Sequence, residues 1–186
     1  MDLPCDLFVG CLCDIKSPLR QSVKEDLEAE IMGEVVHMID SEVFLAFSTY
    51  ATIVTLKMML MAPLTSYFRL TRKAFANMED TSFDMSAEDK KKLVRVDPDV
   101  ERVRRCHQND LENVIPFLVI GLLYALTGPQ LSTALLHFRV FVVSRICHSV
   151  AYLVPLPQPS RGLCFGVGFM TTASMAYRVL TTALYL

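Results

Sequence analysis

Residues 100–126 read VERVRRCHQNDLENVIPFLVIGLLYAL, and no turn signal separates the charged first half from the apolar second half. One continuous helix with a polar end and an apolar end is therefore expected here. The apolar half suits the interior of a membrane. The charged half is either a solvated flange at the membrane surface or a set of side chains that converge on a ligand.

The composition of the chain favours a membrane protein. Of the 186 residues, 52% are hydrophobic and only 20% are charged, which is more apolar than an ordinary soluble domain. The formal net charge is −2, so no overall field attracts nucleic acid, and we expect no nucleic-acid partner.

Four apolar stretches approach the length of about 20 residues that a helix needs to cross a bilayer. Short proline-containing segments, TGPQLS and VPLPQPSR, separate the last three stretches. The sequence predicts an all-α integral membrane four-helix bundle in which helices satisfy every backbone group. The amino-terminal appendage, residues 1–40, lies outside the membrane domain of residues 41–186. The predicted spans are 43–68, 103–127, 131–154 and 161–184.

The orientation follows from the distribution of lysine and arginine. These residues gather in the loop of residues 70–100 and at its borders, while the turn of residues 127–132 has no charged residue. By the positive-inside rule, the 70–100 loop and the 155–161 turn face the cytosol, and both termini lie on the other side.

The charged stretch collects both signs of charge on one helix face. At 100° per residue, six polar side chains fall within an arc of about 140°. Such a face suits a small zwitterionic ligand with several charges, because arginines clamp carboxylates and a carboxylate holds an ammonium group. A face whose charges pair with one another at the headgroup level is an equally good interpretation of this stretch alone. The six are Glu101, Arg104, Arg105, Gln108, Asn109 and Glu112.

A second polar face supports a pocket. Arg145, His148 and Tyr152 are spaced i, i+3, i+7 and share one face of the third span. A lone arginine within a span costs about 2.5–3.5 kcal/mol on an insertion scale, so Arg145 should face the protein interior or a polar cavity. Arg161 begins the fourth span, where its guanidinium adds to the positive end of a helix dipole. Each residue alone is explained by an interior or anchoring role, but together they favour a pocket.

The six cysteines form no disulfide framework, and reduced thiols are the better interpretation. Cys11 and Cys13 have metal-ligand chemistry, but no second ligand pair follows them, so we expect no metal site.

Several segments resemble the MAPEG family, the membrane-associated proteins in eicosanoid and glutathione metabolism, and within it the glutathione-transferase branch. They include EVFLAFSTYATI, VERVRRCHQNDLENVIPFL, AYLVPLPQPSR and SMAYRVL. The resemblance covers about residues 32–186 and leaves residues 1–31 outside.

The resemblance implies a homotrimer that holds glutathione, as a co-substrate, between neighbouring subunits near the cytosolic side. It also implies hydrophobic electrophiles and lipid hydroperoxides as substrates, and a multi-pass location in the endoplasmic reticulum membrane and the mitochondrial outer membrane, in contact with lipid. By position, Arg161 would stabilise the reactive thiolate with help from Tyr152, and Arg69 would reach the site of the neighbouring subunit. The implied glutathione-binding residues are Arg69, Arg104, Arg105, His107, Asn109, Glu112, Arg145, His148 and Tyr152; His107 rests on the resemblance alone.

Some positions depart from the family pattern. Thr81 stands where the transferase branch has a cysteine that thiol reagents modify, and Cys106 is a possible substitute. Gln108 and Gly162 replace residues typical of the prostaglandin E synthase branch, which argues against that activity. The alternatives are a non-enzymatic fatty-acid-binding scaffold like the lipoxygenase-activating protein, or a glutathione-dependent eicosanoid synthase. A pore ranks below both, because the charges cluster at one side of the membrane.

Overall fold

The computed structural model describes the backbone of residues 6–82 and 84–184, and side chains from residue 21 onward within those ranges. Two compact units form, Met1–Ser41 and Glu42–Leu186. The first contains one long helix, α1 (Asp6–Ile39), which exposes apolar side chains such as Val23, Leu27 and Ile31. The cysteines at positions 11 and 13, where no metal site was predicted, lie outside the described side chains.

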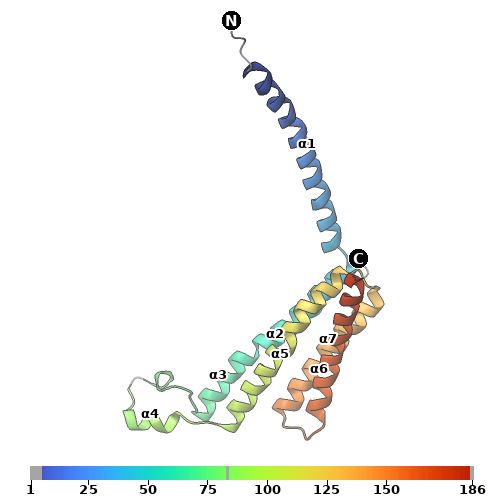
Figure 1. The fold of residues 1–186 in the computed structure, drawn as a ribbon. Coiled ribbons are helices and arrows are strands. Elements are labelled where there is room, and N and C mark those ends of the chain that lie inside the picture. The colour runs from blue at the N-terminus through green and yellow to red at the C-terminus, as the bar shows by residue number, and fades with distance from the viewer. Residues whose placement is uncertain (1–5, 83, 185–186) are drawn as a thin grey trace. The chain divides into compact units, whose positions relative to one another are not determined.

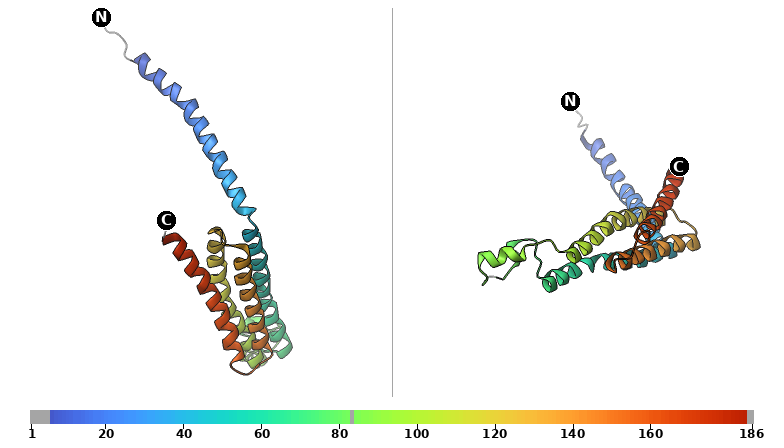
Figure 2. Two further views of the ribbon diagram at one scale, coloured as in Figure 1. Left: turned by 90° about the vertical axis from the view of Figure 1, so that its right-hand side faces the viewer. Right: turned by 90° about the horizontal axis from the view of Figure 1, so that it is seen from below.

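The second unit is a helical bundle with alternating helix directions (Figures 1 and 2). Among the described residues, four helical segments are long and apolar enough to cross a membrane, which confirms the predicted all-α four-span fold. The first segment consists of two consecutive helices. The helices are α2 (Glu42–Met59), α3 (Met61–Arg72), α5 (Pro98–Leu126), α6 (Leu131–Leu153) and α7 (Ser160–Leu184).

Aromatic side chains from three helices fill the centre of the bundle. Phe47 of α2, Phe117 of α5, and Phe138 and Phe141 of α6 are all buried. The rings of Phe117 and Phe141 stack with centroids 3.8 Å apart and planes 3° from parallel. Outward-facing positions also carry large apolar residues, such as Val119 of α5 and Phe169 of α7. Apolar residues on both the inner and outer faces are typical of a bundle that sits in lipid.

The first span breaks between α2 and α3, where a single continuous span was predicted. Pro63 has no N–H group with which to bond the carbonyl of Met59, and its ring crowds that carbonyl. Helix α2 accordingly ends at Met59, although the Leu64 N–H still bonds the Leu60 carbonyl at 3.2 Å. The chain thus keeps a nearly helical path through the break. Helix α3 ends with Lys73 in the left-handed conformation, with φ of 49°.

Helix α5 begins five residues before the predicted start at residue 103. Asp97 caps it, because its carboxylate accepts hydrogen bonds from the backbone N–H groups of Asp99, at 2.9 Å, and Val100, at 3.3 Å. Pro98 occupies the first turn, where no N–H donor is needed. The helix therefore carries the whole charged stretch into the bundle.

The connection from α3 to α5, predicted only as a polar loop of residues 70–100, contains the short helices η1 (Met78–Asp80) and α4 (Ala87–Leu93). Ser86 caps α4 by accepting a hydrogen bond from the Asp89 N–H group. Two hydrogen bonds lower the pKa of the Asp89 carboxyl below its usual value. The larger effect comes from the Lys92 ammonium, and the smaller from the Ser86 hydroxyl. The two ends of the connection are joined by the hydrogen bond from the Phe75 N–H group to the Leu93 carbonyl, at 2.9 Å.

Candidate functional site

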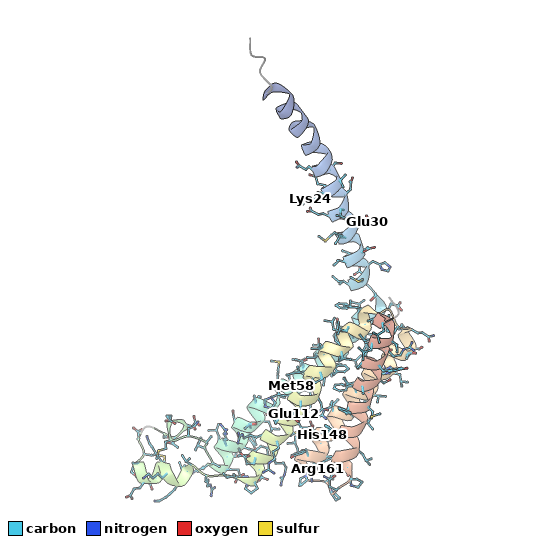
Figure 3. All side chains as sticks on the ribbon, in the orientation of Figure 1. Lys24, Glu30, Met58, Glu112, His148 and Arg161 are labelled. Carbon is cyan, nitrogen blue, oxygen red and sulfur yellow. The ribbon has the colours of Figure 1, made fainter. Side chains whose placement is uncertain are left out.

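The alternating helix directions bring charged helix ends together. The end of α3, the start of α5, the end of α6 and the start of α7 all lie at the same end of the bundle (Figure 1). Arg69, Arg105 and Arg161 come from three of these ends. Figure 3 shows Arg161 at this end, with His148 and Glu112 farther along the helices. Most of the predicted site residues therefore occupy one end of the membrane domain.

A groove of about 500 Å³ lies between α3 and α5, and we call it the α3/α5 groove. The sequence-predicted residues Arg69, Arg104, Arg105 and His107 line it, together with Glu101. Arg104 already uses part of its hydrogen-bonding capacity within the chain, because its Nη1 donates to Glu101 Oε1 across one helix turn. This groove has the size of a small-ligand site and an excess of cationic side chains. It can hold a ligand with more than one carboxylate.

A second groove, of about 430 Å³, lies between the starts of α5 and α7, and we call it the α5/α7 groove. Arg105, Tyr152 and Arg161 line it, so Arg105 contributes to both grooves. The guanidinium carbon of Arg161 lies 5.1 Å from the centre of the Tyr152 ring, a cation–π contact. Its Nε has no hydrogen-bond partner within the described part of the chain. Tyr152 thus supports a guanidinium that retains hydrogen-bonding capacity at the start of α7.

Arg145 does not face either groove within one chain. Its side chain is 0% exposed, and its Nη2 donates to Asn109 Oδ1 and to Asp110 Oδ1, both at 2.8 Å. The same Nη2 lies 3.3 Å from His148 Nδ1. The His148 ring in turn lies 5.7 Å, centroid to centroid, from the Tyr152 ring. The shared face predicted for these three α6 residues is confirmed: Arg145 and His148 point into the bundle, and Tyr152 lines the α5/α7 groove.

Lys57 completes this buried cluster from α2. Its ammonium lies 2.6 Å from Asp110 Oδ1, so one fully buried carboxylate binds two cations. An unpaired carboxylate within a membrane span is unfavourable, and the two cations offset its charge. We call Lys57, Asp110 and Arg145 the buried triad.

Nine of the ten predicted site residues thus divide among three places in a single chain, and Glu112 lies in none of them. Arg69, Arg104, Arg105 and His107 share the α3/α5 groove, and Arg105 joins Tyr152 and Arg161 in the α5/α7 groove. Asn109 and His148 belong with Arg145 in the interior. Glu112 is exposed, and its Oε1 accepts a hydrogen bond from Gln108 Nε2 at 3.2 Å. One chain alone does not assemble all ten residues into one pocket.

Sequence reasoning missed Asp110 and Lys57. The available signal was an acid and a lysine inside apolar spans, since charges in a membrane need partners. The pairing of Asp110 with Lys57 could not be predicted from the sequence, because Arg139 and Arg145 were equally available as cationic partners. In the structure Arg139 Nε donates to Tyr50 Oη at 2.9 Å and leaves Asp110 to the other two.

Two positions bear on modification by thiol reagents. Thr81 is buried, and its hydroxyl donates to the Met78 carbonyl at 2.6 Å. Cys106, the possible substitute thiol, is 0% exposed and bonds to Ser149 Oγ at 3.5 Å. Its burial makes Cys106 a structural thiol in this conformation.

The four apolar helical segments define a multi-pass membrane protein with cationic side chains gathered at one end. The MAPEG family model matches residues 47–181, and this chain belongs to the MAPEG family, which confirms the resemblance found in the sequence.

Relatives in this family include two kinds of enzyme by name. The chain is 59% identical over 155 residues to microsomal glutathione S-transferase 1 of Sus scrofa, and likewise to that of Homo sapiens; each alignment covers 83% of this chain and 100% of the relative. It is 41% identical over 138 residues to prostaglandin E synthase of Homo sapiens, with 74% of this chain and 88% of the relative covered.

Proposed function

We propose that this protein is a membrane-bound glutathione transferase. It conjugates the glutathione thiolate to hydrophobic electrophiles, and it also reduces lipid hydroperoxides with glutathione. The observation that carries the proposal is the 59% identity that extends over the full length of relatives named microsomal glutathione S-transferase 1. The cationic grooves at one end of the bundle support it.

The chemistry of glutathione matches the available side chains. Glutathione carries two carboxylates, one ammonium group and one thiol. Arg69, Arg104 and Arg105 are suited to the carboxylates, because guanidinium groups bind carboxylates through two parallel hydrogen bonds. His107 adds a further polar contact in the same groove, and the exposed Glu112 is suited to the ammonium group.

Arg161 is the residue we assign to the thiol. A cysteine thiol has a pKa of about 8.5, and lowering that value by two units requires about 2.7 kcal/mol of preferential stabilisation of the thiolate. A guanidinium at a helix start, with Tyr152 packed beneath it, is a source of that size. The thiolate sulfur then bonds to the electrophilic carbon, and the leaving group departs with the electron pair of the broken bond.

The assignment of Arg161 predicts a specific loss. In Arg161→Ala, glutathione binding measured by equilibrium dialysis should remain detectable, while the thiolate absorbance that follows mixing with glutathione should disappear. Conjugation to 1-chloro-2,4-dinitrobenzene should fall about 100-fold, a loss typical when one group that stabilises an anion is removed.

Arg178→Ala is the matched control for that experiment. Arg178 is an exposed arginine of the same helix, near the other end of α7, so this variant should form the thiolate normally. Unchanged thiolate formation in Arg161→Ala would refute the role of Arg161.

A second candidate function is prostaglandin E synthesis, which the 41% identity to human prostaglandin E synthase favours. Gln108 and Gly162 argue against it, because the synthase branch carries a basic and a hydroxyl residue at those places. Formation of prostaglandin E by the purified protein at a rate comparable to conjugation would support the synthase. Absence of any glutathione-dependent activity in a folded protein would support a fatty-acid-binding scaffold.

We further propose that the protein acts as a homotrimer, with glutathione held between subunits and Arg69 supplied by the neighbour. The division of the predicted residues among three places in one chain supports this assembly. The lysine and arginine content of the 70–100 loop supports a cytosolic position for the site. We assign the protein to the endoplasmic reticulum and mitochondrial outer membranes, which imaging of the tagged protein would test.

A further inference from the structure

The buried triad is built from three helices and lies outside both grooves. Lys57 comes from α2, Asp110 from α5 and Arg145 from α6. Asp110 and Arg145 have fully buried side chains, and the Lys57 side chain is 14% exposed. Neither Lys57 nor Asp110 lines the α3/α5 groove or the α5/α7 groove. Their contacts are with each other and, through Asp110, with Arg145.

The buried triad holds the Arg145 guanidinium in a defined place, and some of the N–H donors of this guanidinium remain unused. Arg145 Nη2 is bonded to Asp110 and Asn109, whereas its Nε and Nη1 are buried and have no hydrogen-bond partner among the residues that the structure describes. A buried donor without a partner is unfavourable unless something else satisfies it. Asp110 thus fixes the guanidinium while two of its nitrogens remain available.

Charge balance explains the presence of Lys57. A carboxylate paired with Arg145 alone would cancel the positive charge of the guanidinium. With Lys57 bound to the same carboxylate, the buried triad keeps one net positive charge. Electrostatic interactions are strong where the dielectric constant is low. The net positive charge of the buried triad therefore attracts anions held near it.

We propose that Lys57 and Asp110 are positioning residues for glutathione: Asp110 holds Arg145 in place, and Lys57 preserves the net positive charge that attracts the anionic tripeptide. The proposal rests on the proposed function, because it presumes that glutathione is the ligand. Neither residue touches glutathione, and each acts through Arg145. The chemical class selected is a small anion with carboxylates.

The decisive experiment compares Lys57→Met with the double variant Lys57→Met/Asp110→Asn. The single variant leaves the cluster with no net charge, and the KM for glutathione should rise about tenfold, while kcat at saturating glutathione changes much less. The double variant restores one net positive charge, and the amide oxygen introduced at position 110 can still accept from Arg145. Its KM should return to within about threefold of the parent value.

A merely structural role predicts a different pattern. If the triad only stabilises the bundle, the double variant loses both of its ion pairs and should be at least as impaired as the single variant. A double variant with a KM no lower than that of Lys57→Met, or a Lys57→Met variant with an unchanged KM, overturns the proposal. If Lys57→Met does not fold, the double variant is compared with the parent protein: a KM within about threefold supports the proposal, and a rise of about tenfold or more overturns it.

Two further variants complete the design. Lys57→Arg keeps the charge and should retain the parent KM. Lys92→Met breaks a lysine–aspartate pair of the same type, with Asp89 in α4, that is exposed and outside the spans; it should leave KM unchanged. A parent protein without glutathione-dependent conjugation would count against the proposed function instead, so the two failures are distinguishable.

Discussion

Gly168 shows how closely a single residue of α7 approaches the buried cluster. A Cβ atom added there would lie 2.9 Å from Ser144 Oγ and 3.5 Å from Arg145 Cδ. Ser144 has little freedom to move, because its hydroxyl donates to the Phe141 carbonyl at 2.7 Å. Gly168→Ala should therefore reduce the free energy of unfolding by about 1–3 kcal/mol, the usual cost of overpacking. Unfolding of the purified protein in a denaturing detergent measures this change.

Gly166→Ala is the control for this prediction. It lies in the same helix, two residues away, and an added Cβ there meets nothing within 4 Å. It should be neutral or slightly stabilising, since alanine is the better helix former. Equal unfolding free energies for the two variants would contradict the packing argument.

At the residue scale, spacing was predictable but pairing was not. The i, i+3, i+7 spacing placed Arg145, His148 and Tyr152 on one face, and their ring and guanidinium contacts confirm it. The direction of that face depends on which helix packs against it, and a helical wheel holds no such information. Asp110 and Lys57 lie 53 residues apart in sequence, so their ion pair follows from tertiary packing alone.

At the element scale, the start of α5 tests whether a side-chain cap stabilises the beginning of a helix. Asp97→Ala removes the acceptor for two backbone N–H groups and should lower the free energy of unfolding by about 1 kcal/mol. Asp97→Asn keeps an acceptor oxygen, so its free energy of unfolding should be close to that of the parent protein. Detergent unfolding measures both variants; an Asp97→Asn variant as unstable as Asp97→Ala would show that the side-chain cap is not the cause.

The starts of α6 and α7 were easier to predict from the sequence. Spans three and four begin within a residue of the predicted positions, since prolines and turn residues mark both boundaries. The cap at Asp97 was missed because it lies inside a polar segment, where no change in hydropathy marks a helix start. The break at Pro63 was missed because a proline within an apolar run leaves the hydropathy pattern unchanged.

At the scale of the whole molecule, the helix order was predictable because the connections are short. Segments of a few residues between α5 and α6, and between α6 and α7, allow only antiparallel neighbours. The connection between α3 and α5 is longer, and there the ion pair of Arg72 with Asp99, at 2.6 Å, holds the end of α3 beside the start of α5. The sequence of one chain contains no comparable constraint on how copies of the chain pack together.

Assembly can be tested by complementation between two variants. We propose that Arg69 serves the site whose Arg161 belongs to the neighbouring subunit. Arg69→Ala and Arg161→Ala should each be nearly inactive alone. When the two chains are coexpressed with different tags and mixed oligomers are purified through both tags, some sites combine an intact Arg161 from one chain with an intact Arg69 from the other. In a cyclic trimer that contains both chains, one of the three sites has this combination, whichever chain is present twice.

Conjugation to 1-chloro-2,4-dinitrobenzene by the mixed oligomers should therefore recover to about one third of the parent rate. If Arg69 and Arg161 instead serve the site within one chain, every site in the mixture lacks one arginine, and no activity returns. Oligomers formed from the double variant and the parent chain provide the control, because they show how activity responds to dilution of intact chains alone. Activity in the complementing mixture no higher than in the separate variants would exclude a site shared between subunits in this way.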